Sequence, residues 1–211
     1  MRTLLDRCTT QLQHAVVEFP WTDRQAYGDW LAQTYYYVRH STRLLAAASA
    51  RFGLDARGDA LHYRFAAHIS EEKRHEQLAL HDLKRLGFSL EDFSERHSTR
   101  LFYEPQYFKI EHEAPSALFG YILPLEVVGP AVGKDLCAKL VAAFGPKCET
   151  FFRVHAEEDG DHVEKAMRLI DTVPENERPY LLRNIEQSVY AYCAMLQDIL
   201  AAPAGAARSG T

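Results

Sequence analysis

Residues 155–162 read His-Ala-Glu-Glu-Asp-Gly-Asp-His, so that His155, Asp159 and His162 occupy positions i, i+4 and i+7. Because a helix turns about 100° per residue, these side chains would lie within about 40° of one another on one face. Two imidazoles and a carboxylate suit iron, manganese or zinc better than calcium or magnesium, which prefer oxygen ligands. Random placement of ten histidines and twelve aspartates would give this spacing roughly 0.03 times per chain. The stretch predicts a helix with a metal site, and the alternative is a solvated acidic face.

A second segment, residues 68–75, reads His-Ile-Ser-Glu-Glu-Lys-Arg-His. Glu72 and His75 are spaced i, i+3, which is how helical bundles present a carboxylate and an imidazole to a shared metal. Glu71, four residues before His75, and His68 are the alternative ligands in this segment. The pattern is weak evidence by itself, since chance gives about 0.8 such pairs per chain. An exposed helix with Glu–Lys and Glu–Arg pairs is the competing interpretation.

A third signal is Glu126, the one charged residue within the apolar stretch 117–129. An unpaired buried carboxylate costs several kcal/mol, so Glu126 needs a partner. That partner is an arginine, a hydrogen bond to the protonated acid, or a metal ion. Pro124 and Gly129 would loosen the helix backbone around it.

The remainder of the chain also shows helical periodicity, and no alternating strand pattern bounded by Asn-Gly or Asp-Gly turns occurs. We therefore expect one all-α domain of about seven or eight helices over residues 1–202, followed by a disordered tail at 203–211. Residues 88–115 give a mixed pattern. The expected helices are 3–18, 22–52, 59–86, 117–128, 134–144, 148–170 and 175–201.

Composition excludes several classes of protein. The 211 residues are 47% hydrophobic and 25% charged, which is ordinary for a globular chain. A net charge of -5 gives no reason to expect binding to nucleic acid or to an anionic membrane. The four cysteines form no CxxC pair, which argues against a zinc ribbon or a thioredoxin-type site. With no signal peptide and no run of ~18 apolar residues, we expect a cytoplasmic location and no membrane span.

The order of these motifs resembles that of the heme-oxygenase-like diiron oxidases and oxygenases. That order is E-x2-H, then a lone glutamate in an apolar helix, then H-x3-D-x2-H. The segment 28–38, Gly-Asp-Trp-Leu-Ala-Gln-Thr-Tyr-Tyr-Tyr-Val, is similar to the second helix of the wider superfamily that includes heme oxygenase and thiaminase II. The resemblance covers roughly residues 20–201.

The resemblance implies a heme-oxygenase-like bundle that binds two iron ions, with manganese as the alternative metal, and uses O2 as a co-substrate. Activities in the family include fatty-acid decarboxylation, N-oxygenation, carbon–carbon cleavage and formation of 4-aminobenzoate from a tyrosine. The expected partners are a small-molecule substrate and a second copy of this chain in a homodimer. The ligand positions of the family match Glu72, His75, Glu126, His155, Asp159 and His162.

Charge favours a particular substrate. Two ferrous ions carry one more positive charge than three carboxylates return, and the excess favours an anionic ligand such as a substrate carboxylate. By the same resemblance Tyr35 would be a catalytic tyrosine and Lys134 its assisting lysine. Such tyrosines more often simply pack with their hydroxyls hydrogen-bonded.

Three competing interpretations use the same fold. A thiaminase II-type hydrolase needs a cysteine on the fifth helix, and residues 116–130 contain none. A heme oxygenase-type protein could use His14 or His40 as a heme ligand, but would leave the carboxylates unexplained. A non-catalytic iron-binding or interaction protein is the third. Two irons per chain with oxygen chemistry would indicate the diiron enzyme, a Soret band with hemin would indicate the heme oxygenase-type protein, and no redox chemistry would indicate the non-catalytic protein.

Overall fold

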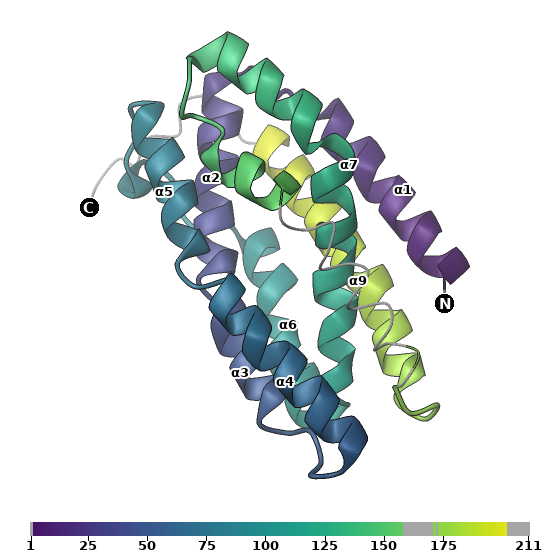
Figure 1. The fold of residues 1–211 in the computed structure, drawn as a ribbon. Coiled ribbons are helices and arrows are strands. Elements are labelled where there is room, and N and C mark those ends of the chain that lie inside the picture. Colours follow the sequence, from purple (N-terminus) through teal and green to yellow (C-terminus); the bar gives the residue numbers. More distant parts are fainter. Residues whose placement is uncertain (1, 158–170, 172, 202–211) are drawn as a thin grey trace, which may run out of the picture.

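The computed structural model describes residues 2–157, 171 and 173–201, and every regular element within them is helical (Figure 1). Residues 150–157 are also helical, and the rest of the helix expected at 148–170 lies outside the described residues, as does the predicted tail. In chain order the elements are α1 (Arg2–Glu18), α2 (Arg24–Val38), α3 (Ser41–Ser49), α4 (Ala56–Glu71), α5 (His75–Arg85), η1 (Leu90–Asp92), α6 (His97–His112), η2 (Pro115–Leu118), α7 (Phe119–Phe144) and α9 (Arg178–Ala201).

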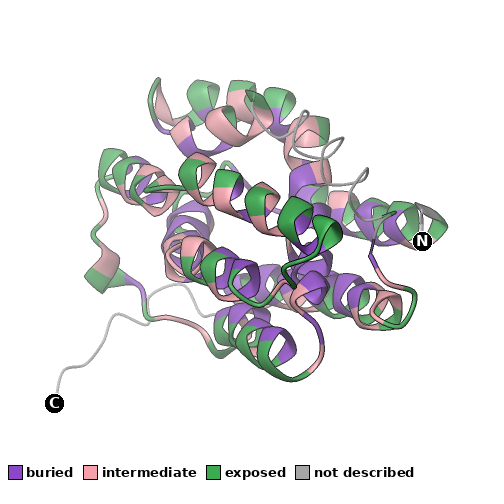
Figure 2. Ribbon diagram, turned by 60° about the horizontal axis from the view of Figure 1, so that its bottom comes forward, coloured by how far each residue is buried: buried purple, intermediate pink, exposed green. Residues whose placement is uncertain are grey.

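The helices form a bundle with one continuous apolar core. Helix α9 packs against α1, α6 and α7, while α2 contacts α5 and α3 contacts α4. The helices turn their buried faces inward and their exposed faces to solvent, as expected for amphipathic elements (Figure 2). The all-α class predicted from the sequence is confirmed for the described residues.

Two of the predicted helices are each divided into two. The helix expected at 22–52 is α2 and α3, separated at Arg39 and His40, where the His40 ring stacks on Tyr103 at 4.1 Å between centroids. The helix expected at 59–86 is α4 and α5, and its break contains Arg74 in the left-handed conformation with φ 71°. The prediction of one helix was wrong in both places, because apolar periodicity continues across a break of two or three residues.

The segment 117–144 shows the opposite error, because α7 is one helix where two were expected. Pro124 and Pro130 lie inside it, and each removes an N–H that would bond the carbonyl four residues earlier. Packing against α1 and α9 holds the helix together across both prolines. The span Pro115–Phe144 is also long and apolar enough to cross a membrane by length and composition. Its most apolar part is 61% buried inside the bundle, as is usual for a core helix.

Two glycines of α7 allow its neighbours to approach closely. A Cβ on Gly120 would lie 2.5 Å from the Leu181 carbonyl oxygen of α9. A Cβ on Gly133 would lie 2.6 Å from the Cβ of Ala156, on the helix that carries His155. Gly133 therefore fixes the spacing between the helix of Glu126 and the helix of His155.

We expect Gly133→Ala to lower the free energy of unfolding by about 1–3 kcal/mol, because the added methyl group overpacks this contact. Gly53→Ala is the matched control: a Cβ on Gly53 would have nothing within 4 Å of it, so the effect of that substitution should be small. Urea denaturation of both variants measures the difference. Equal stability of the two variants would contradict the close contact at Gly133.

Candidate metal centre

Three potential ligands from three helical segments meet inside the bundle. One donor atom from each of Glu72, His75 and His155 lies within 4.8 Å of the other two. Glu72 is the residue that caps the end of α4, and His75 is the first residue of α5. Their side chains therefore meet across the break at Arg74, with His75 Nδ1 3.4 Å from Glu72 Oε2. The two histidine rings pack edge to face at 4.9 Å between centroids.

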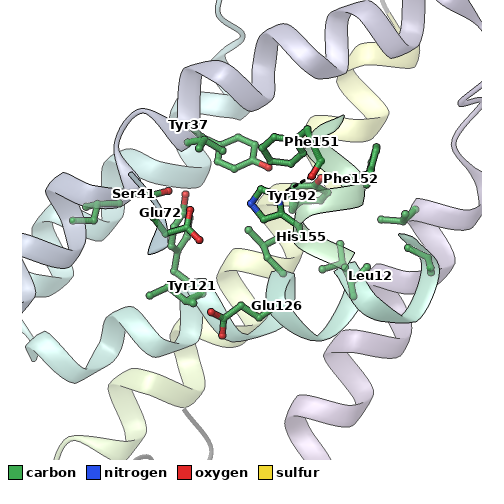
Figure 3. Close-up of a pocket in the computed structure, with 18 of the residues that line it drawn as sticks. Leu12, Tyr37, Ser41, Glu72, Tyr121, Glu126, Phe151, Phe152, His155 and Tyr192 are labelled. Atoms are coloured by element: carbon green, nitrogen blue, oxygen red, sulfur yellow. Dashed lines mark hydrogen bonds between the residues drawn. The ribbon is translucent and has the colours of Figure 1, made fainter. Parts of the chain in front are cut away.

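This cluster opens onto a cavity of about 120 Å³ that Glu126 also lines (Figure 3). His68 lies between the two glutamates: its Nε2 is 3.4 Å from Glu72 Oε1 and 3.3 Å from Glu126 Oε1. The rest of the wall is mainly aliphatic and aromatic, and includes Trp30, Phe151 and Phe152. Two carboxylates and two imidazoles thus face one largely apolar enclosure.

The two glutamates have opposite pKa shifts. Burial raises the pKa of Glu126 to about 7, and the nearby charges of His68 and Arg64 offset only part of that effect. Burial also acts to raise the pKa of Glu72, but hydrogen bonds from His68 and His75 outweigh it and hold this pKa well below its usual range. Of the two glutamates, Glu72 is thus the one that ionises more readily when no metal is bound.

The orientation of His155 is set by the peptide groups of Phe151. His155 Nδ1 lies 2.7 Å from the Phe151 carbonyl oxygen and donates to it, which places the lone pair of the neutral ring on Nε2. The ring also stacks on the Phe151 side chain at 4.2 Å between centroids. The Phe151 N–H in turn donates to Asp82 Oδ2 at 2.8 Å. Metal-binding histidines are typically held this way, by a hydrogen bond at the other ring nitrogen.

The donor set fits the metal that the sequence predicts. Carboxylate and imidazole ligands together are typical of iron sites in helical bundles. Glu72, His75 and His155 would hold a metal, and Glu126 faces the same cavity. The predicted ligands Asp159 and His162 lie outside the described residues, so their place in the site stays a prediction.

The structure distinguishes the alternative ligands within residues 68–75. Glu71 accepts a hydrogen bond from Arg64 Nη1 at 2.9 Å and is not part of the cavity wall. Glu72 and His68 both line the cavity, and His68 contacts Glu72 and Glu126. The structure thus brings Glu72, rather than Glu71, to His75.

The two residues given catalytic roles by resemblance lie away from this cavity. Tyr35 packs against Tyr36 and under the Arg39 guanidinium, and Lys134 is exposed on α7. Neither lines the cavity, whereas Tyr37, two residues after Tyr35, does. The catalytic roles of Tyr35 and Lys134 stay predictions.

The two histidines considered as heme ligands are also elsewhere. The His14 side chain is 73% exposed and lies beside Glu18. His40 stacks on Tyr103, and its Nδ1 is 2.8 Å from the Tyr107 hydroxyl. Neither histidine lines the cavity.

Sequence reasoning missed two residues of the site. Asp82, completely buried, anchors Phe151, and Tyr121 lines the cavity. Asp82 follows His75 by seven residues and so lies on the same face of α5, which is a signal that the sequence does contain. Tyr121 had no such signal, because an aromatic residue in an apolar helix is usually core.

Solved structures share this fold. A domain of unknown function with a heme oxygenase-like fold from Shewanella denitrificans superposes with a TM-score of 0.81 at 19% identity, over 94% of this chain and 91% of that one. A TenA homolog from Pseudomonas syringae gives 0.80 at 16% identity, with the same coverage of both chains. A TenA family transcription regulator from Silicibacter gives 0.62 at 14% identity, over 94% and 92%. At these identities the likeness shows the fold alone, and it confirms the heme-oxygenase-like fold predicted from the sequence.

No protein with a curated description matches the sequence. A family model described as "iron-containing redox enzyme" matches residues 28–197, which is most of the chain. The ligands that meet at the cavity are of the type that iron binds. The chain therefore belongs to the family of iron-containing redox enzymes.

Proposed function

We propose that this protein is a non-heme diiron oxidase or oxygenase that uses O2 to oxidise a small organic substrate. The observation that carries the proposal is the convergence of Glu72, His75 and His155 beside a cavity that Glu72, His155 and Glu126 line. Asp159 and His162, whose helical spacing after His155 matches the family, would complete a set of six ligands. Membership of an iron-containing redox family supports iron as the metal.

Two ferrous ions bound by these residues would supply the electrons that activate O2. The chain's own contribution is to hold the ligands and to keep bulk water out. Trp30 and Phe152 stack at 4.5 Å between centroids and form part of the apolar wall. His68, with Nε2 near both Glu72 and Glu126, connects the two carboxyl groups across the cavity wall.

A carboxylate-bearing substrate is the preferred substrate class. Its support is the excess positive charge of two ferrous ions over three carboxylates, which an anionic group would neutralise. The candidate reaction types are N-oxygenation, carbon–carbon cleavage or decarboxylation, and 4-aminobenzoate-type chemistry. The small cavity favours a compact molecule for any of them.

We expect the purified chain to bind two irons and to consume O2 when loaded with Fe(II). His75→Ala and His155→Ala should each reduce bound iron, because each removes one of the three converging ligands. Glu126→Ala should abolish oxygen uptake. Elemental analysis measures the iron, and an oxygen electrode measures the uptake.

His14→Ala serves as the control, because this exposed histidine is remote from the cavity and should keep full iron content. Full iron occupancy in both His75→Ala and His155→Ala would rule out the proposed centre. Normal oxygen uptake in Glu126→Ala would show that Glu126 has only a structural role.

A separate prediction concerns the stability of the metal-free protein. The pKa of Glu126 is about 7 in the folded chain against an ordinary value of 4.5, so between these pH values the unfolded state loses its proton first. Ionisation therefore favours unfolding, and the stabilising effect of the protonated acid is lost as pH rises through about 7. The shift corresponds to about 3 kcal/mol. Glu126→Gln should remove this part of the pH dependence.

Urea denaturation of metal-free protein at pH 5 and pH 8 measures this difference. Glu186→Gln is the matched control, since the Glu186 side chain is 52% exposed and should leave the pH dependence unchanged. The same loss of stability between the two pH values in wild type and Glu126→Gln would show that Glu126 is not the titrating group.

A further inference from the structure

Tyr121 has a buried hydroxyl to which no described residue forms a hydrogen bond. The residue is 4% exposed, and its hydroxyl has no hydrogen-bond partner among the described residues. Buried polar groups in native proteins are nearly always hydrogen-bonded, to protein, ordered water or a ligand. An exception therefore calls for an explanation at this position.

Other buried tyrosines of the bundle show the usual arrangement. Tyr192, which lines the same cavity, accepts a hydrogen bond from Trp30 Nε1 at 3.0 Å. Tyr27 donates to the Cys148 carbonyl oxygen at 2.6 Å. Tyr121 also lines the cavity, but its buried hydroxyl has no such contact among the described residues.

The cavity beside this hydroxyl has a definite chemical character. In Figure 3 Tyr121 lies near Glu72 and Glu126, with His155 further along the same enclosure. The aromatic side chains Trp30, Phe151 and Phe152 also line this cavity. A cavity of roughly 150 Å³ with apolar walls holds benzene, so the smaller volume of about 120 Å³ here limits the ligand to about six non-hydrogen atoms. Such a ligand could place an apolar body against the aromatic wall and a polar group at Tyr121.

We propose that Tyr121 determines substrate specificity by donating a hydrogen bond to an oxygen acceptor, a carbonyl or a carboxylate, on a small substrate that is otherwise apolar. This proposal rests on the proposed function, because it assigns the same cavity to the substrate. The hydroxyl selects the substrate by its oxygen, and the aromatic wall selects it by size and apolar character. A molecule of the same shape without the oxygen would leave the hydroxyl buried and unpaired, which weakens its binding.

Three ligands matched in their number of non-hydrogen atoms test this. Cyclopentanone carries a carbonyl, isobutyrate carries a carboxylate, and methylenecyclopentane has no acceptor. Isothermal titration calorimetry on Fe(II)-loaded protein without O2 measures binding without turnover. We expect at least one of the two oxygen-bearing ligands to bind about tenfold more tightly than methylenecyclopentane, which is the size of one buried hydrogen bond. Tyr121→Phe, which removes only the hydroxyl, should abolish this preference.

Tyr192→Phe is the matched control. It removes the hydroxyl of another residue that lines the cavity, but that hydroxyl already accepts a hydrogen bond from Trp30 Nε1. It should keep the preference for the oxygen-bearing ligand while lowering the midpoint of thermal unfolding, because the Trp30 N–H loses its acceptor. Tyr121→Phe should leave that midpoint unchanged or raise it.

Several outcomes would overturn the proposal. These are an unchanged preference in Tyr121→Phe, equal binding of all three ligands to the wild type, or no binding of any of them. Preference for isobutyrate would identify the acceptor as a carboxylate, and preference for cyclopentanone as a neutral carbonyl. The same titrations on metal-free protein separate this result from the iron measurement, so failure of the diiron assignment and failure of the Tyr121 assignment are distinguishable.

Discussion

The contact of one imidazole, that of His68, with two buried carboxylates is the constraint on which the rest of the site depends. Its Nε2 lies 3.4 Å from Glu72 and 3.3 Å from Glu126, inside a wall that is mainly apolar. Burial removes the solvation of both carboxyl groups, and each would ionise most easily beside a cation. Metal ions bound in the cavity would supply that charge. His68 of α4 and Glu126 of α7 thus meet at the cavity, where both line the wall.

The Phe151 peptide groups form a second junction, which connects α5 with the helix of His155. The N–H of Phe151 is held by Asp82, and its carbonyl oxygen accepts from His155. Since α5 also begins with His75, one helix positions both imidazoles of the three-residue cluster. Gly133 completes the arrangement from the other side, because it admits the His155 helix close to α7. The ligands are therefore fixed by contacts between helices, each of which involves few atoms.

The sequence predicts the features of the site that follow from neighbouring residues in one helix, and it does not predict those that depend on tertiary packing. Glu126 was predictable because a lone carboxylate in an apolar helix must find a partner wherever the helix packs. The break at Arg74 was not predictable, since a single residue with φ 71° leaves the apolar periodicity on either side intact. Tyr35 and Tyr37 are about 200° apart on a helix, so their spacing alone cannot say which of them faces the site. That choice is made by tertiary packing, which places Tyr37 at the cavity.

Helix α7 combines the two demands of a site that must exclude water and still bind polar groups. Its cavity-facing side chains include Leu125 and Val132, and among its described cavity-lining residues Glu126 and Tyr121 carry the polar atoms. An apolar helix of this kind contributes little hydrogen bonding of its own, so each polar side chain on it interacts strongly with whatever enters. Glu126 is suited to a cation and the Tyr121 hydroxyl to an acceptor. Because the two preferences are opposite in sign, metal and substrate need not compete for the same group, and one helix can serve both.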